Sequence, residues 1–206
     1  LVIGSGAIGV EFARFYSDMG AEVTIVEMLD RILPVEDEDV SAFMHKQLTR
    51  QGMKVHVSSG VEKHEAGPTG VEAMLKGGEA RDFSHAIVAI GIAPNSEGIG
   101  LGALGVETDR GHIVTDGYGR TNVEGVYAIG DVTGPPWLAH KASHEGVVCV
   151  EAIAGKKPPP FETWNIPGST YSRPQVASVG LTEAKAKEEG RKVRTGKFPF
   201  IGNGKA

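Results

Sequence analysis

The sequence predicts an α/β fold whose core is a doubly wound parallel sheet, and three observations support this prediction. Short apolar runs alternate with amphipathic helical patterns over the N-terminal part of the chain. The glycine-dense turn Gly4-x-Gly6-x-x-Gly9 directly follows the first apolar run. A second apolar run, 21–27, ends on an acidic residue. Alternation of strands and helices in this way predicts a right-handed, doubly wound layout.

The first strand, residues 1–3, leads into the glycine turn. Gly4 permits the tight turn, and Gly6 lets a pyrophosphate approach the backbone. Gly9 lets the following helix pack closely against the sheet. The first helical amides, near Ala7, then face the ligand, and the helix dipole favours negative charge there. The turn therefore predicts a Rossmann-like dinucleotide site, with close packing without a ligand as the alternative explanation.

The second strand ends at Glu27, about 20 residues beyond the glycines, where a dinucleotide fingerprint has an acid. A carboxylate there accepts hydrogen bonds from the adenosine ribose hydroxyls. A 2′-phosphate would meet a like charge, and only Arg31 is near to offset it, so NAD is favoured over NADP. The alternative is a solvated carboxylate at the end of a strand.

The elements that follow complete the N-terminal unit. Residues 35–52 form an amphipathic pattern with early acids and late bases, which predicts a second helix. A third strand is expected at 53–57. Further β structure is expected at 70–75 and 85–91, around a turn of two glycines.

A glycine-rich connector follows, and the prolines at 158–160 are the best candidate linker. Before them, residues 126–129 predict a strand that runs into Gly130 and Asp131, with a helix from about Trp137. A carboxylate in this position can hold the hydroxyls of a sugar alcohol while helix amides face a phosphate or ring. An aspartate that only shapes the turn is an equally good explanation from the residues alone.

Composition excludes several classes of function. The 206 residues carry 21 basic and 26 acidic side chains, so no basic field exists for nucleic acid. No apolar run approaches the roughly 20 residues of a membrane span. The single cysteine, Cys149, excludes an internal disulfide, and His140 and His144 lack a third metal ligand nearby. We expect a soluble, cytoplasmic protein without a metal site, and Cys149 as a buried, unreactive thiol.

Several stretches together resemble one family. They are GSGAIGVEF around the glycine turn, VAIGIAPN (88–95), a T-x6-A-x-G-D segment (121–131), LAHKA (138–142) and PQVASVGLTEAKAKEEG (174–190). On these motifs the chain resembles the flavoprotein disulfide reductases. LAHKA and the residues after it resemble in particular the branch that oxidises dihydrolipoamide. Many members carry an arginine where Ile92 stands, so one polar contact is expected to be missing.

The resemblance implies two cofactors, FAD and NAD, and three units along the chain. Residues 1–93 would form the Rossmann-like NAD-binding domain, 94–160 the C-terminal part of an FAD-binding domain, and 161–206 the start of an α+β dimer-interface domain.

By family position, the NAD site would comprise Gly4, Gly6, Ala7, Gly9, Glu27 and Gly91, and the FAD site Asp131 with backbone groups of Leu138, Ala139 and His140. Glu11 matches a family glutamate near the flavin and nicotinamide, where it pairs with a lysine from outside the segment. An ordinary first-turn acid that complements the helix dipole is the alternative for Glu11.

The resemblance further implies that the chain is an internal segment of a longer enzyme. A C-x4-C redox pair is expected before it and an H-x4-E pattern after it, so no catalytic residue is expected within it and the segment alone should be inactive. The whole enzyme would oxidise protein-bound dihydrolipoamide through the disulfide and FAD and pass hydride to NAD+.

As partners, the resemblance implies a second copy of the enzyme in a homodimer, and the lipoyl domains and core of a 2-oxo acid dehydrogenase complex. Two alternatives stay open at this point. One is a related reductase that acts on glutathione, a quinone or mercuric ion, and the other is a non-catalytic NAD-binding module.

Overall fold

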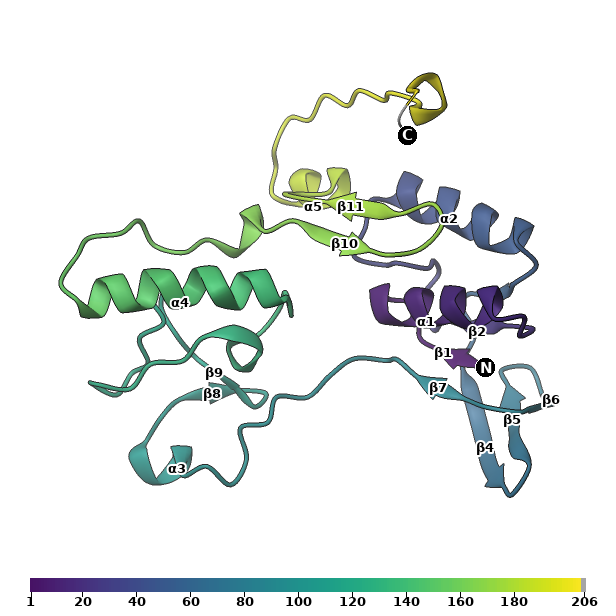
Figure 1. Ribbon diagram of the computed structural model, residues 1–206, viewed down its shortest axis with the longest axis horizontal. Helices are drawn as coiled ribbons and strands as arrows, with labels where there is room; N and C mark the ends of the chain where they lie inside the picture. Colours follow the sequence, from purple (N-terminus) through teal and green to yellow (C-terminus); the bar gives the residue numbers. More distant parts are fainter. Residues whose placement is uncertain (205–206) are drawn as a thin grey trace.

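The structure, a computed structural model, describes residues 1–204, so the last two residues of the expected interface segment lie outside the described part. Figure 1 shows an N-terminal unit with a parallel sheet, from which an extended segment leads to a second group of elements around a long helix. The chain then returns and ends beside the helices of the N-terminal unit.

The N-terminal unit is built on a parallel sheet with the strand order β3-β2-β1-β7. Its four strands are β1 (Val2–Ile3), β2 (Thr24–Val26), β3 (Lys54–His56) and β7 (Ile87–Val88). In the register, Val2 lies opposite Ile25 on one side and Ile87 on the other. The central position of β1 confirms the predicted parallel α/β fold and places the glycine turn at the middle of the sheet edge.

Two helices cover this sheet, α1 (Ala7–Asp18) and α2 (Glu38–Arg50). Helix α2 begins after Asp37, whose carboxylate accepts the Asp39 N–H as an N-cap. Its buried residues, spaced three or four apart, are Ser41, Met44 and Leu48. The core between helices and sheet includes Val2, Val10, Ala13, Ile25, Ile32, Leu33, Met44 and Leu48. Both helices were expected from the sequence pattern.

A three-stranded antiparallel sheet is inserted between β3 and β7. Its strands are β4 (Val61–Gly67), β5 (Gly70–Leu75) and β6 (Glu79–Phe83). Gly77 and Gly78 have positive φ angles and form the turn between β5 and β6, as the sequence predicted. Ala73 and Leu75 of β5 pack with Leu1 and Val26, which attaches this insertion to the parallel sheet.

The second group of elements follows β7. It contains α3 (Leu101–Leu104), β8 (Thr108–Asp109), β9 (His112–Ile113), the 3-10 turn η1 (Gly130–Thr133) and α4 (Ala139–Ile153). A small core that includes Val106, Ile113 and Ala128 supports it.

The strand predicted at 126–129 is wrong. Within the described residues, only Tyr127 of this stretch forms a β-bridge, with Arg120. A strand needs a neighbouring strand that pairs with it along its length, and here a single residue, Arg120, pairs with the stretch. The helix begins at Ala139, two residues after the start expected near Trp137, with the extended Leu138 as its N-cap residue.

The C-terminal elements are η2 (Thr163–Asn165), β10 (Gly168–Thr170), β11 (Val176–Ser178), α5 (Glu183–Glu188) and η3 (Phe200–Gly202). Of these, β10 packs against α1, and Val176 of β11 belongs to the core of the N-terminal unit. Strands β10 and β11 form an antiparallel pair. In residues 1–204, none of the helices has the length and apolar character needed to cross a membrane.

Candidate functional site

The loops after β1, β2 and β7 meet at one edge of the parallel sheet, because the carboxyl ends of parallel strands point the same way. Gly4 donates its N–H to the carbonyl of Val26 (2.8 Å), and Ala89 donates to that of Ile3 (2.7 Å). Strand β1 lies between β2 and β7, so the chain order reverses here. In doubly wound sheets this switch point is where ligands bind, and exposed Gly91 lies two residues beyond Ala89 at the same edge.

The three glycines of the fingerprint differ in the structural reason for which a glycine is needed. A Cβ on Gly4, which has φ +97°, would lie 2.3 Å from the Ala89 carbonyl oxygen. A Cβ on Gly9 would lie 2.1 Å from the Gly4 carbonyl oxygen. Gly6 has an ordinary φ of −64°, and a Cβ there would meet nothing within 4 Å. The positive φ angle and the close approach of the chain after β7 therefore explain Gly4, and the close approach of α1 to the turn explains Gly9. Within the described residues neither packing nor backbone strain explains Gly6.

Helix α1 begins next to this open space, with Gly6 as its N-cap residue. Gly6 provides no side-chain hydrogen bond, and the first turn of α1 contains no acidic residue. The amides at the start of the helix, from half-buried Ala7 onward, lack intrahelical acceptors. Free amides and the positive end of the helix dipole suit a phosphate group.

Glu27 is buried beside the turn, with 8% of its surface exposed. Its carboxylate accepts hydrogen bonds from the Ser5 hydroxyl (2.7 Å), the Ser5 N–H (2.9 Å) and the Leu29 N–H (2.9 Å). Burial raises the pKa of Glu27, but these hydrogen bonds outweigh it and hold the pKa below its ordinary value of 4.5. Glu27 is therefore not a solvated carboxylate at the end of a strand. It is a buried carboxylate that hydrogen bonds hold in place at the sheet edge.

Glu11 lies in the second turn of α1 rather than the first. Its Oε1 accepts the N–H of Tyr171 at 2.8 Å, which connects α1 to the segment just after β10. The first-turn explanation of this residue is therefore wrong. Sequence reasoning missed the bond because its two partners are 160 positions apart.

A second cluster of site residues lies where η1 packs against α4. Asp131 is exposed in η1, and within residues 1–204 its side chain makes no hydrogen bond. Helix α4 begins with Leu138 as its N-cap, again without a side-chain cap. Ala139 and His140 are exposed, and the His140 Nε2 lies 2.8 Å from the Pro167 carbonyl oxygen. The exposed Asp131 carboxylate and the uncapped start of α4 thus lie on two elements that pack against each other.

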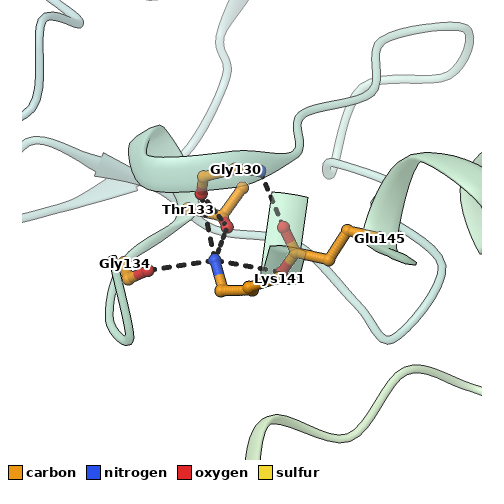
Figure 2. Close-up of polar contacts among 5 residues, drawn as sticks. All are labelled: Gly130, Thr133, Gly134, Lys141 and Glu145. Atoms are coloured by element: carbon orange, nitrogen blue, oxygen red, sulfur yellow. Dashed lines mark hydrogen bonds and ion pairs between the residues drawn. The ribbon is translucent and has the colours of Figure 1, made fainter. Parts of the chain in front are cut away.

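Two residues that sequence reasoning missed hold this cluster together, Lys141 and Glu145 (Figure 2). The Lys141 ammonium is 1% exposed and lies 3.0 Å from Glu145 Oε1. It also donates to groups of the η1 turn, and Glu145 Oε2 accepts the Gly130 N–H at 2.7 Å. The signal was present as an acid and a base four positions apart on a helix, but such pairs are usually solvent-exposed.

The histidine pair and the single cysteine were also considered from the sequence. Among residues 1–204, no group of three or more potential metal ligands was found, which includes the surroundings of His140 and His144. Cys149 is buried, as expected. Burial and the nearby Asp116 raise the pKa of its thiol, which the Arg120 charge only partly offsets, so the reactive thiolate is disfavoured.

Similarity to known proteins agrees with this geometry. Residues 1–146 match the sequence model of the pyridine nucleotide-disulphide oxidoreductases, and residues 166–206 match that of the dimerisation domain of these oxidoreductases. The chain is 56% identical to dihydrolipoyl dehydrogenase from Zymomonas mobilis and 54% identical to that from Rhizobium etli. All of the chain aligns in both cases, but it covers only 45% and 44% of those proteins.

Solved structures show the same arrangement. LpdA from Mycobacterium tuberculosis matches 91% of the chain with a TM-score of 0.83 and 30% identity, over 41% of its own length. The HOCl-induced flavoprotein disulfide reductase RclA from Escherichia coli matches 92% with a TM-score of 0.83 and 27% identity, over 44% of its length. The chain therefore spans less than half of the proteins that it matches. It belongs to the pyridine nucleotide-disulphide oxidoreductase family.

Proposed function

We propose that this chain is the NAD-binding and partly FAD-binding portion of a dihydrolipoyl dehydrogenase. The observation that carries the proposal is Gly6, which faces open space beside the uncapped start of α1 although the fold does not require a glycine there. The names of the relatives, which are at least 54% identical over the whole chain, support dihydrolipoamide as the substrate.

The first sheet edge fits NAD. The amides from Ala7 onward would hold the pyrophosphate over Gly6. Gly4 lets the chain after β7 approach the turn, and Gly9 lets α1 pack against it. The Glu27 carboxylate, held by Ser5 and Leu29, would accept the ribose hydroxyls. Its negative charge would oppose a 2′-phosphate, which favours NAD over NADP. Gly91 at the same edge would lie near the nicotinamide.

The second cluster fits part of an FAD site. Asp131 would accept hydrogen bonds from the ribityl hydroxyls, and the backbone of Leu138, Ala139 and His140 would present the positive end of α4. Glu11 is proposed to lie near both cofactors; its second carboxylate oxygen is free to pair with a lysine from the rest of the protein. When bound, the two cofactors supply hydride transfer. The residues of this chain bind and orient them.

The match to a dimerisation domain supports a homodimer. We further propose that the whole enzyme works in the cytoplasm on the lipoyl domains of a 2-oxo acid dehydrogenase complex and docks on its core. The units 1–93, 94–160 and 161–206 are proposed as the NAD-binding, FAD-binding and interface portions.

The direct test is an activity assay on the purified full-length protein. With dihydrolipoamide and NAD+, we expect NADH to form, and we expect NADP+ to be at least about 100-fold less efficient, equivalent to ~2.7 kcal/mol. Reduction of oxidised glutathione, a quinone or mercuric ion by NADH or NADPH, with no NADH formed from dihydrolipoamide and NAD+, would contradict the proposed substrate. Binding of NADH without any turnover would favour a non-catalytic module.

A further inference from the structure

The most unusual charged group of the chain is the Lys141 ammonium. Lysine is almost never fully buried unless it is paired. This lysine lies in the first turn of α4, where the helix dipole is unfavourable for a cation. Its burial therefore needs compensation from specific contacts.

The contacts come from a single turn and one glutamate. Lys141 Nζ donates to the carbonyl oxygens of Gly130 (3.0 Å) and Gly134 (3.1 Å) and to the Thr133 hydroxyl (3.1 Å). Glu145 Oε1 lies 3.0 Å away. An ammonium has three N–H donors, so four acceptors saturate it. Figure 2 shows the nitrogen at the centre of these contacts.

Glu145 completes the arrangement from the next turn of the helix. Its other oxygen, Oε2, accepts the Gly130 N–H at 2.7 Å, so the pair binds both the N–H and the carbonyl of Gly130. The two side chains hold the turn at its beginning, through Gly130, and at its end, through Gly134.

Asp131 lies inside this held turn but takes no part in the network. Its side chain is exposed, and Lys141 and Glu145 bind the backbone on either side of it. The turn is therefore fixed without using the carboxylate, which stays available for a ligand.

We infer that Lys141 and Glu145 are positioning residues that preform the turn 130–134 and thereby aim Asp131 at FAD. The inference rests on the proposed role of Asp131 in holding FAD. A pair that served only stability would be replaceable, because well-packed apolar residues often stabilise a core as well as a buried ion pair does. The two roles therefore predict different behaviour of variants.

The first experiment measures the dissociation constant of FAD, by flavin fluorescence, for the full-length enzyme and its variants. Glu145→Gln keeps the shape of the side chain, but an amide cannot accept both the ammonium and the Gly130 N–H. We expect the dissociation constant to rise about tenfold or more. The matched control is Glu151→Gln, which removes the exposed pair of Glu151 with Lys156 near the end of α4, and should stay within about twofold of the wild type. An unchanged constant in Glu145→Gln overturns the inference.

The double variant Lys141→Met with Glu145→Leu separates positioning from stability. It removes both charges while keeping apolar volume. We expect a folded protein whose FAD dissociation constant stays raised about tenfold or more, because the turn has lost its partners. Recovery of wild-type FAD affinity in this variant overturns the inference.

Should these variants not fold, hydrogen exchange of the wild-type enzyme stripped of FAD decides the question. A preformed turn predicts slow exchange of the Gly130 amide before FAD is added, whereas exchange at the unprotected rate overturns the inference. A wild-type enzyme that binds no FAD at all would instead contradict the proposed function, so the two failures are distinguishable.

Discussion

At Gly6 and Gly9, the same residue type serves two purposes, and single substitutions separate them. Gly9→Ala places a Cβ 2.1 Å from the Gly4 carbonyl oxygen, so we expect the protein to lose about 1–3 kcal/mol of stability through overpacking. Gly6→Ala places its Cβ in open space. We expect its melting temperature to match the wild type while its NADH dissociation constant rises about tenfold, or ~1.4 kcal/mol.

Thermal melts and NADH fluorescence titrations of the full-length enzyme check both outcomes. A Gly6→Ala variant that binds NADH as tightly as the wild type would show that the open space is not the pyrophosphate site. Gly102, which also has open space for a Cβ but lies in α3, provides the matched glycine-to-alanine control.

Glu27 predicts a pH dependence of stability. Its pKa in the folded protein lies below the ordinary value of 4.5, so its stabilising contribution is complete above that value and is lost as the pH falls through the folded pKa. Glu27→Gln should cost about 1.5–3 kcal/mol near neutral pH, because it loses hydrogen bonds to a charged group. Its deficit should shrink as the pH falls below the ordinary pKa of 4.5 and through the lower pKa of the folded protein.

Melting temperatures of the wild type and of Glu27→Gln, recorded across the acid range, measure this difference. A deficit that stays constant down to the lowest accessible pH would mean that the charge of Glu27 does not contribute.

At the level of single residues, spacing alone was enough to name the fingerprint glycines and Glu27 as candidate residues of a dinucleotide site. It could not predict that Ser5 fixes the Glu27 carboxylate, because that contact depends on how the loops after β1 and β2 approach each other. It also missed Lys141, since burial of a charge depends on partners from another element.

At the level of elements, Asp37 joins two helices. Its carboxylate caps α2 through the Asp39 N–H and accepts the Glu183 N–H at the start of α5 (3.0 Å). The Glu183 hydrogen bond is the main cause of the lowered pKa of Asp37. Asp37→Ala should therefore cost about 1–2 kcal/mol and speed up hydrogen exchange at the start of α5. Asp37→Asn keeps only one of the two acceptor oxygens, so it should lose less stability than Asp37→Ala but not match the wild type.

Urea unfolding and hydrogen exchange of the two variants test this link. Equal losses in Asp37→Ala and Asp37→Asn would show that the acceptor geometry at this position is not what stabilises the helices.

Among the elements, helices with a clear 3.6-residue pattern, such as α2, were predictable from the sequence because local residues decide them. The strand expected at 126–129 failed for the opposite reason. Its β-branched and aromatic residues favour a strand, but a strand also needs a partner, and Tyr127 finds only Arg120.

At the level of the whole molecule, helix α1 carries an exposed apolar face. Ile8, Phe12, Phe15, Tyr16 and Met19 are all exposed, and they recur at helical spacing. A large exposed apolar patch marks an interaction surface. Because the chain covers less than half of its relatives, we expect the rest of the full-length protein to cover this face.

Binding of the dye ANS tests this expectation. The isolated 206-residue chain should bind the dye strongly, and the full-length enzyme should bind it weakly. Equal and strong binding to both proteins would mean that α1 stays exposed in the complete enzyme. The sequence could not predict this face as exposed, since an apolar stripe on a helix usually faces its own core.

A crystal structure of the full-length enzyme with NAD+ would show whether the sheet edge at Gly6 binds a pyridine nucleotide. We expect the pyrophosphate on the first amides of α1, above Gly6, and the adenosine ribose at the Glu27 carboxylate. A nucleotide bound elsewhere, with the space at Gly6 filled by side chains of the protein, would contradict this expectation.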